Sequence, residues 1–178
     1  MRADFTLYTP EYISGVMSLR KPQKKSLEIL DIIVNSVNLK KGMNLQAALG
    51  AVKALYPTCT DFERDFMSLT FALATGVGKT RLMGAFIAYL YTQHNIKNFF
   101  VVAPNTTIYN KLCRDLNDNN SPKYVFRGLS CFVNAPQVIT GEDYRSKPLS
   151  LFQSEVWGKL QLYGGNIAGK SDKIVAFS

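Results

Sequence analysis

Residues Thr75 to Thr80 combine types and spacings that can hold a polyphosphate. Glycine lets the backbone come close to a ligand, so amide N–H groups at a helix start can point at phosphate oxygens. A lysine there reaches the terminal phosphates, and a hydroxyl next to it can ligate Mg²⁺. The sequence therefore predicts a site for a nucleoside triphosphate and Mg²⁺, with Thr80 as the metal ligand and the loop formed by Thr75, Gly76, Val77, Gly78, Lys79 and Thr80.

A second stretch, Gly164 to Ser171, meets the strict pattern GxxxxGK followed by Ser or Thr. The first stretch departs from it, because Leu73 stands at the first glycine position. A phosphate loop needs a buried strand before it and a long helix after it. Only seven residues follow Ser171, and the preceding Leu160 to Tyr163 is weakly apolar. We therefore predict phosphate binding by the first loop and a glycine-rich turn for the second.

Alternating strand and helix patterns surround the first loop. Upstream, two amphipathic helices are expected over Pro22–Val37 and Leu45–Tyr56, and residues 1–18 have no clear period. From Asp61 onwards the patterns predict, in order, a strand covered on both faces at Met67–Ala74, a helix over 79–92, a strand at Phe99–Ala103, a helix from its cap Asn105 to about Leu116, and short strands at Tyr124–Phe126 and Gln137–Thr140. This order is typical of an α/β fold with a parallel sheet and crossover helices.

Composition sets the class of protein. The length of 178 residues suits one domain, or one domain with a helical lead-in. No apolar run is long enough to span a membrane, and the first residues do not form a signal peptide, which predicts a soluble protein. Three separated cysteines without a CxxC pair favour reduced thiols in the cytoplasm, and the single His94, expected in the loop after a helix, lacks a partner for a catalytic dyad. The net charge of +8 either attracts a polyanion such as nucleic acid or forms a solvated surface.

The stretches LTFALATGVGKTRLMGAFIAYLY and NFFVVAPNTTIYNKL resemble the ATPase subunit of type III restriction enzymes. More broadly, they are similar to the first RecA-like domain of superfamily 2 helicases and translocases. The resemblance covers roughly residues 19 to 153. It implies an incomplete RecA-like P-loop domain over residues 61–178, preceded by a helical lead-in over residues 1–60 that carries an adenine-recognition-like element.

The resemblance also implies roles for single residues. Arg20-Lys21-Pro22-Gln23 is similar to the adenine-recognition element, which makes Gln23 the reader of the base; the alternative is an exposed residue in the first turn of a helix. Pro104, Asn105 and Thr106 correspond to a motif that touches the nucleic-acid backbone, and the last two also suit a helix cap. Thr140 and Gly141 fall in a further stretch of the type III pattern, which implies contact with the backbone of a bound nucleic-acid strand.

The acidic pair that helicase-type ATPases use to hold Mg²⁺ and activate water is missing. Glu142-Asp143 come closest, but in the reverse order. No catalytic residue is therefore predicted. The expected protein is the N-terminal fragment of an ATP-driven translocase on double-stranded DNA, from an endonuclease with a modification methyltransferase partner, able to bind ATP at best. The alternatives are a P-loop ATPase of another lineage without nucleic acid, and a decayed DNA-binding remnant.

Overall fold

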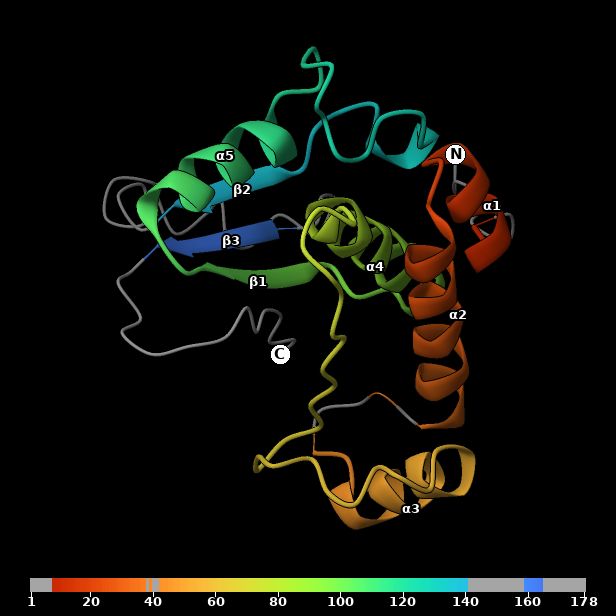
Figure 1. The fold of residues 1–178 in the computed structure, drawn as a ribbon. Coiled ribbons are helices and arrows are strands. Elements are labelled where there is room, and N and C mark those ends of the chain that lie inside the picture. Colours follow the sequence, from red (N-terminus) through yellow and green to blue (C-terminus); the bar gives the residue numbers. More distant parts are fainter. Residues whose placement is uncertain (1–7, 38, 40–41, 141–158, 165–178) are drawn as a thin grey trace.

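The computed structural model describes residues 8–37, 39, 42–140 and 159–164. Figure 1 shows its elements, which are α1 (Pro10–Val16), α2 (Lys21–Ser36), α3 (Leu45–Leu55), α4 (Lys79–His94), β1 (Asn98–Ala103), α5 (Thr106–Asn117), the 3₁₀ turn η1 (Ser130–Phe132), β2 (Gln137–Thr140) and β3 (Lys159–Gly164). The helices expected from the apolar periodicity are confirmed as α2, α3, α4 and α5. Helix α1 was not expected; the Thr9 hydroxyl caps it by accepting from the Tyr12 N–H, and Pro10 suits its first turn.

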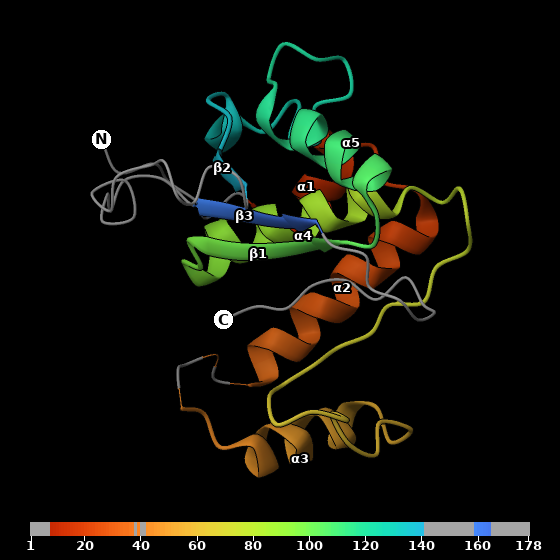
Figure 2. The same cartoon turned by 90° about the vertical axis from the view of Figure 1, so that its left-hand side faces the viewer.

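The described strands form one three-stranded sheet in the order β1-β3-β2. Both neighbouring pairs are parallel, with Ala103 opposite Gly164 and Thr140 opposite Leu162. Helix α5 packs on all three strands. Figures 1 and 2 agree that α4 lies beside the sheet on the side of α2. The strands predicted at 99–103 and 137–140 are therefore confirmed as β1 and β2.

The strand predicted at Met67–Ala74 is wrong, because this segment forms no ladder with any described strand. Its side chains nevertheless alternate: Leu69, Phe71 and Leu73 are half-buried against the core, and the residues between them are exposed. The Phe71 ring meets the Phe86 ring of α4 edge to face at 4.8 Å. The apolar residues are thus buried on one face only, by packing on a helix rather than by strand pairing.

The strand predicted at Tyr124–Phe126 is also wrong, because these residues form consecutive turns. All three side chains are buried, and Phe126 stacks on Phe132 at 4.2 Å. Gly84 of α4 allows this close approach, since a Cβ there would lie 1.9 Å from the Val125 side chain. The apolar run therefore packs against α4 from a turn.

One main core joins the N-terminal helices to the rest. It contains Ile13 of α1, Leu27 of α2, Phe86 of α4 and Val101 of β1. A smaller cluster forms where α3 meets the end of α2, with Val52 at its centre. The expected division into a lead-in over residues 1–60 and a P-loop domain over residues 61–178 stays a prediction.

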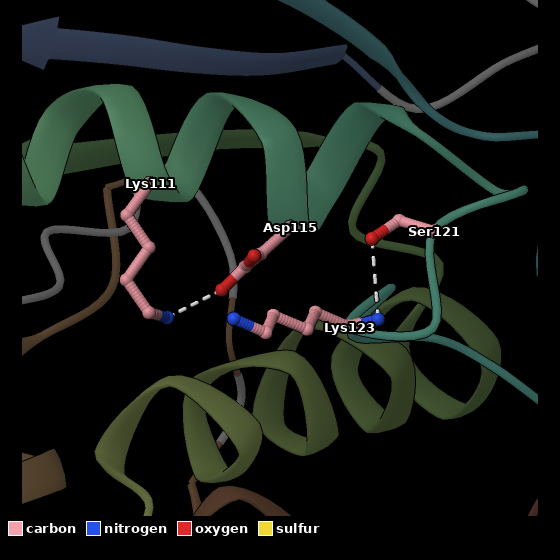
Figure 3. A network of polar contacts seen from close by, with 4 residues as sticks. All are labelled: Lys111, Asp115, Ser121 and Lys123. Atoms are coloured by element: carbon pink, nitrogen blue, oxygen red, sulfur yellow. Dashed lines mark hydrogen bonds and ion pairs between the residues drawn. The ribbon is translucent and has the colours of Figure 1, made fainter.

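The C-terminal half of α5 carries a buried charge. The Asp115 carboxylate is buried and forms an ion pair with the Lys111 ammonium one turn earlier (Figure 3). In the same view the Lys123 side chain extends towards Asp115, and its backbone N–H donates to the Ser121 hydroxyl at 3.2 Å. The Asp115 carbonyl accepts from the Val125 N–H at 2.8 Å. The backbone bond from Val125 therefore attaches the segment after α5 to the last turn but one of the helix, and the ion pair lies within the helix.

The three cysteines carry free thiols. Burial raises the pKa of the Cys131 thiol to about 11. Among the described helices, none combines the length and the apolar character that crossing a membrane requires.

Candidate nucleotide-binding site

The loop at residues 75–80 has the backbone geometry that its glycines allow. Gly76 and Gly78 have φ angles of +80° and +94°, a region that other residues rarely adopt. Gly78 is the N-cap of α4 and has no side chain with which to cap it. The N–H groups in the first turn of a helix are the ones that can bond a ligand; in α4 the Arg81 N–H already donates to the Gly78 carbonyl at 3.0 Å. Thr75, Gly76, Gly78 and Lys79 are exposed, and Val77 and Thr80 are half-buried, so solvent and an anion can reach the loop.

This loop lies at the carboxyl edge of the sheet, which we define as the edge where β1 and β2 end. A connection of residues 95–97 joins α4 to β1, so the two run in opposite directions. On the right of Figure 2, the start of α4, the end of β1 and the start of α5 lie at this edge. Ligands of open α/β sheets bind outside the carboxyl ends of the strands. The loop therefore lies on the side of the sheet where ligands of such folds bind. The strand expected directly before it is absent from the described sheet, whereas β3 ends at Gly164, where the second loop begins.

Three hydrogen bonds join the loop and the first turn of α4 to the corner between α1 and α2, which we define as residues Met17–Gln23. The Arg20 Nη1 donates to the Gly76 carbonyl at 3.1 Å, and the Gln23 Nε2 donates to the Gly78 carbonyl at 2.8 Å. In the reverse direction, the Arg81 Nη1 donates to the Met17 carbonyl at 2.8 Å. The α1–α2 corner is thus hydrogen-bonded to the backbone carbonyls of the loop, and α4 is hydrogen-bonded to the corner.

Gln23 is buried, with 1% of its surface exposed, so the alternative of an exposed residue in a first turn is wrong. Its Oε1 accepts from the Arg20 N–H at 2.7 Å, while its Nε2 bonds Gly78. The structure brings Gln23 to the loop at residues 75–80 across 55 positions of sequence. Its contact with adenine stays a prediction.

The residues predicted to touch nucleic acid share the carboxyl edge. Asn105 caps α5, because its Oδ1 accepts from the Ile108 N–H at 2.9 Å; this confirms the predicted cap. Thr106 is exposed in the first turn, and Pro104 is half-buried before it. Thr140 ends β2, two strands away from β1 in the same parallel sheet, or roughly 10 Å. Residue Gly141, the Glu142-Asp143 pair and the second loop from Gly165 to Ser171 lie outside the described residues.

The site residues fit a magnesium nucleotide through phosphate rather than through a protein metal cage. Across the described ranges, no group of three or more His, Cys, Asp or Glu side chains could hold a metal ion. Mg²⁺ that accompanies a nucleotide keeps several waters and needs only one or two protein ligands besides the phosphates. The half-buried Thr80, second residue of α4, is placed to provide one such ligand.

Comparison with protein families shows which family the chain belongs to. The family model for the res subunit of type III restriction enzymes matches residues 16–155. The chain belongs to this family. The match includes the whole α1–α2 corner, the loop at residues 75–80 and both stretches at the carboxyl edge. Searches of curated proteins and of solved structures found no match.

Membership in the res-subunit family supports a helicase-like ATPase part with a RecA-like P-loop fold. Helicase-like ATPase domains of this family generally use ATP and Mg²⁺, and the family generally works on DNA with a methyltransferase partner.

Sequence reasoning missed two arginines of this site. Arg20 belongs to a run of basic residues whose spacing is equally typical of a solvated face, and Arg81 follows the loop without a pattern of its own. Both make contacts across more than 50 positions. The position of Arg20 three residues before Gln23, inside the adenine-recognition-like element, was the one available signal.

Proposed function

We propose that this chain binds Mg-ATP at the loop Thr75–Thr80 as the nucleotide-binding part of an ATP-dependent DNA translocase of a type III restriction enzyme. The observation that carries the proposal is the exposed N-terminus of α4, opened by two left-handed glycines at the carboxyl edge of a parallel sheet. A triphosphate there would meet the positive end of the helix and the Lys79 ammonium.

The roles within the site follow from position. The backbone of Thr75, Gly76, Val77 and Gly78 surrounds the phosphates, Lys79 spans the terminal ones, and the Thr80 hydroxyl ligates Mg²⁺. When bound, the nucleotide supplies the negative charge that these donors are arranged to meet. Everything that the chain itself contributes is orientation and electrostatic attraction.

Double-stranded DNA would lie along the carboxyl edge. Thr106 and the free amides at the start of α5 suit a DNA phosphate, and Asn105 orients that helix end. Thr140, with Pro104 on the neighbouring side of β3, offers a second backbone contact at the same edge. The net charge of +8 favours such a polyanion.

Binding without appreciable turnover is expected from these 178 residues alone. The sequence has no adjacent acidic pair in the order that helicase-type ATPases use. In related enzymes an arginine finger alone contributes about 10³- to 10⁵-fold to turnover. We therefore expect bound ATP to dissociate faster than it is hydrolysed.

The experiment that tests the site is calorimetric titration of Mg-ATP into the chain and into Lys79→Ala. We expect the variant to lose at least about 100-fold in affinity, because charge-assisted bonds to phosphate contribute roughly 1.5–3 kcal/mol each. Lys53→Ala, which removes an exposed lysine from the last turn of α3, is the matched control and should bind as the native chain does. Equal affinity of native chain and Lys79→Ala would exclude this loop as the phosphate site.

A second variant tests the competing loop. Gly169→Val places a β-branched side chain in the stretch that meets the strict sequence pattern. We expect Mg-ATP affinity to be unchanged. A large loss would show that the C-terminal loop binds the phosphates.

A further inference from the structure

We propose that Lys111 and Lys123, which we call the lysine pair, bind a backbone phosphate of duplex DNA beside the C-terminal half of α5. The inference rests on the proposed function in one respect, the choice of DNA as the polyanion. It starts from a buried carboxylate towards which two lysine side chains extend (Figure 3).

The carboxylate belongs to Asp115, of which only 5% is exposed. A buried carboxylate is stable only when it is paired with a cation or hydrogen-bonded. Lys111 supplies an ion pair from one turn earlier, while 48% of its own side chain stays exposed. An ammonium group has three N–H donors. The ion pair therefore holds a charged group at the surface and leaves it donors for a further acceptor.

The second lysine approaches from the loop after α5. Figure 3 shows the Lys123 side chain extending towards Asp115. The backbone of this loop is hydrogen-bonded on both sides of the lysine: the Lys123 N–H donates to the Ser121 hydroxyl at 3.2 Å, and the Val125 N–H donates to the Asp115 carbonyl at 2.8 Å. Lys123 itself is exposed. The loop therefore brings a second ammonium group to the place where the first one is held.

The charges at this place do not balance. Two ammonium groups face one carboxylate, and the exposed Arg114 and Arg127 add to the excess. The exposed Asp118 opposes it, with an Oδ1 that accepts from the Asn120 N–H at 3.1 Å. Residues 106–128 carry four basic and two acidic side chains, a net charge of +2. An exposed cationic place of this kind favours phosphate, whose oxygens accept charge-assisted hydrogen bonds from lysine.

The position along α5 favours a duplex as the source of that phosphate. Asp115 lies nine residues after Thr106, or roughly 13 Å at the rise of an α-helix. The major groove of B-DNA is about 12 Å wide. A duplex that touches the start of α5 with one strand can therefore meet the lysine pair with the other strand.

The test measures binding of a short DNA duplex to the full chain by fluorescence anisotropy over a range of salt concentrations. Lys123→Gln removes one ammonium group and keeps the ion pair between Lys111 and Asp115. We expect the slope of log affinity against log salt to become shallower by about 0.9, and the affinity at about 0.1 M salt to fall roughly eight-fold.

Two further variants separate a phosphate contact from general charge. Lys53→Gln removes an exposed lysine from the last turn of α3 and changes the net charge equally, so its slope should equal the native one. Lys123→Arg keeps the positive charge and should also keep the native slope. Equal losses in Lys123→Gln and Lys53→Gln would overturn the inference, because the basic excess would then act without a defined site.

The plainer alternative is that Lys123 only shields the Asp115 carboxylate. That role predicts a less stable Lys123→Gln variant in urea unfolding, with the native salt slope, and this result would overturn the inference. The nucleotide site is tested separately, because Lys79→Ala is measured by calorimetry without DNA and its outcome leaves the duplex slopes unaffected. A native chain that binds no duplex would overturn the inference together with the DNA part of the proposed function, and would leave the Mg-ATP site to calorimetry.

Discussion

The two ends of α4 are both attached to α2, but by opposite kinds of contact. At the N-terminal end, donors of the α1–α2 corner bond backbone carbonyls of an exposed loop. At the C-terminal end, side chains bond side chains: the Tyr89 hydroxyl donates to the Asp31 carboxylate, which also accepts from the Asn35 amide at 2.8 Å. Only 2% of Tyr89 is exposed. At the N-terminal end the hydrogen bonds occupy backbone carbonyls of an exposed loop. At the C-terminal end the polar side chains bond one another.

The difference supports the proposal that the N-terminal end of α4 binds phosphate and the C-terminal end is structural; we call them the binding end and the structural end. At the structural end, burial raises the pKa of the Tyr89 hydroxyl, and its hydrogen bond to Asp31 adds to the shift. The His94 Nε2 lies 3.3 Å from the same hydroxyl, and burial lowers the pKa of His94 although the Asp31 charge opposes this. His94 is the last residue of α4, so the loop position expected from sequence is wrong. Changes at the binding end should affect affinity, and changes at the structural end should affect stability.

The largest effect should follow from Gly78→Ala. The new methyl group would meet the Gln23 amide, and an alanine at a φ of +94° is strained. We expect a loss of about 1–3 kcal/mol in the free energy of unfolding and a loss of Mg-ATP binding. Denaturant unfolding and calorimetry measure the two. Gly42→Ala, at a φ of +75° with nothing near its Cβ, should lose stability alone; equal ATP affinity in both variants would contradict the role of Gly78.

A smaller effect, on stability only, is expected from Asp31→Ala. The variant removes the Asp31 acceptor of the buried Tyr89 hydroxyl and leaves it only the longer contact to the His94 Nε2, which costs about 1–3 kcal/mol. Urea unfolding followed by circular dichroism measures this loss. Affinity for tripolyphosphate should change by less than about two-fold, or about 0.4 kcal/mol, because Asp31 contacts the structural end of α4. The exposed Asp65→Ala is the control for removing a negative charge. A loss of phosphate affinity without unfolding would show that the two ends are coupled.

The smallest effect concerns pH. The folded chain binds a proton at His94 less readily than the unfolded chain, because burial lowers the pKa of His94 from 6.5. Below pH 6.5 the unfolded state therefore binds more protons, and stability falls as the pH drops. His94→Gln, which removes the chain's single histidine, should lose this part of the pH dependence. The free energy of unfolding is measured by urea unfolding between pH 5 and 7, the range in which histidine titrates. Identical slopes against pH for the native chain and His94→Gln would contradict the prediction.

Local signals predicted the helices and the loop, and long-range contacts explain what they missed. Helix α4 follows from residues that neighbour one another in sequence, and so do its two left-handed glycines. The Met67–Ala74 segment alternates as a strand would, but its pattern cannot say whether a neighbouring strand pairs with it. The Tyr124–Phe126 run is apolar on every side and packs from a turn. A three-residue run has too few positions to distinguish the two.

The candidate site shows the same division between local signals, which the sequence reveals, and long-range contacts, which it does not. Gly76, Gly78 and Lys79 were identified because their types and order are the signal. The position of Gln23 in the first turn of α2 was evident as well, but its bond to Gly78 joins residues 55 positions apart. No pattern within α2 distinguishes a buried first-turn glutamine from an exposed one. The structure supplies this contact, and the role of Gln23 as the reader of the base stays a prediction.

The most direct test of the central claim is an NMR titration of the isotope-labelled chain with Mg-tripolyphosphate, a ligand without a base. The phosphate site at the binding end of α4 predicts the largest amide shifts at Gly76, Gly78, Lys79 and Thr80. It predicts small shifts around Tyr89 and His94. Shifts concentrated between Gly164 and Ser171, or no shifts at Gly76 and Gly78 at saturating ligand, would contradict the account.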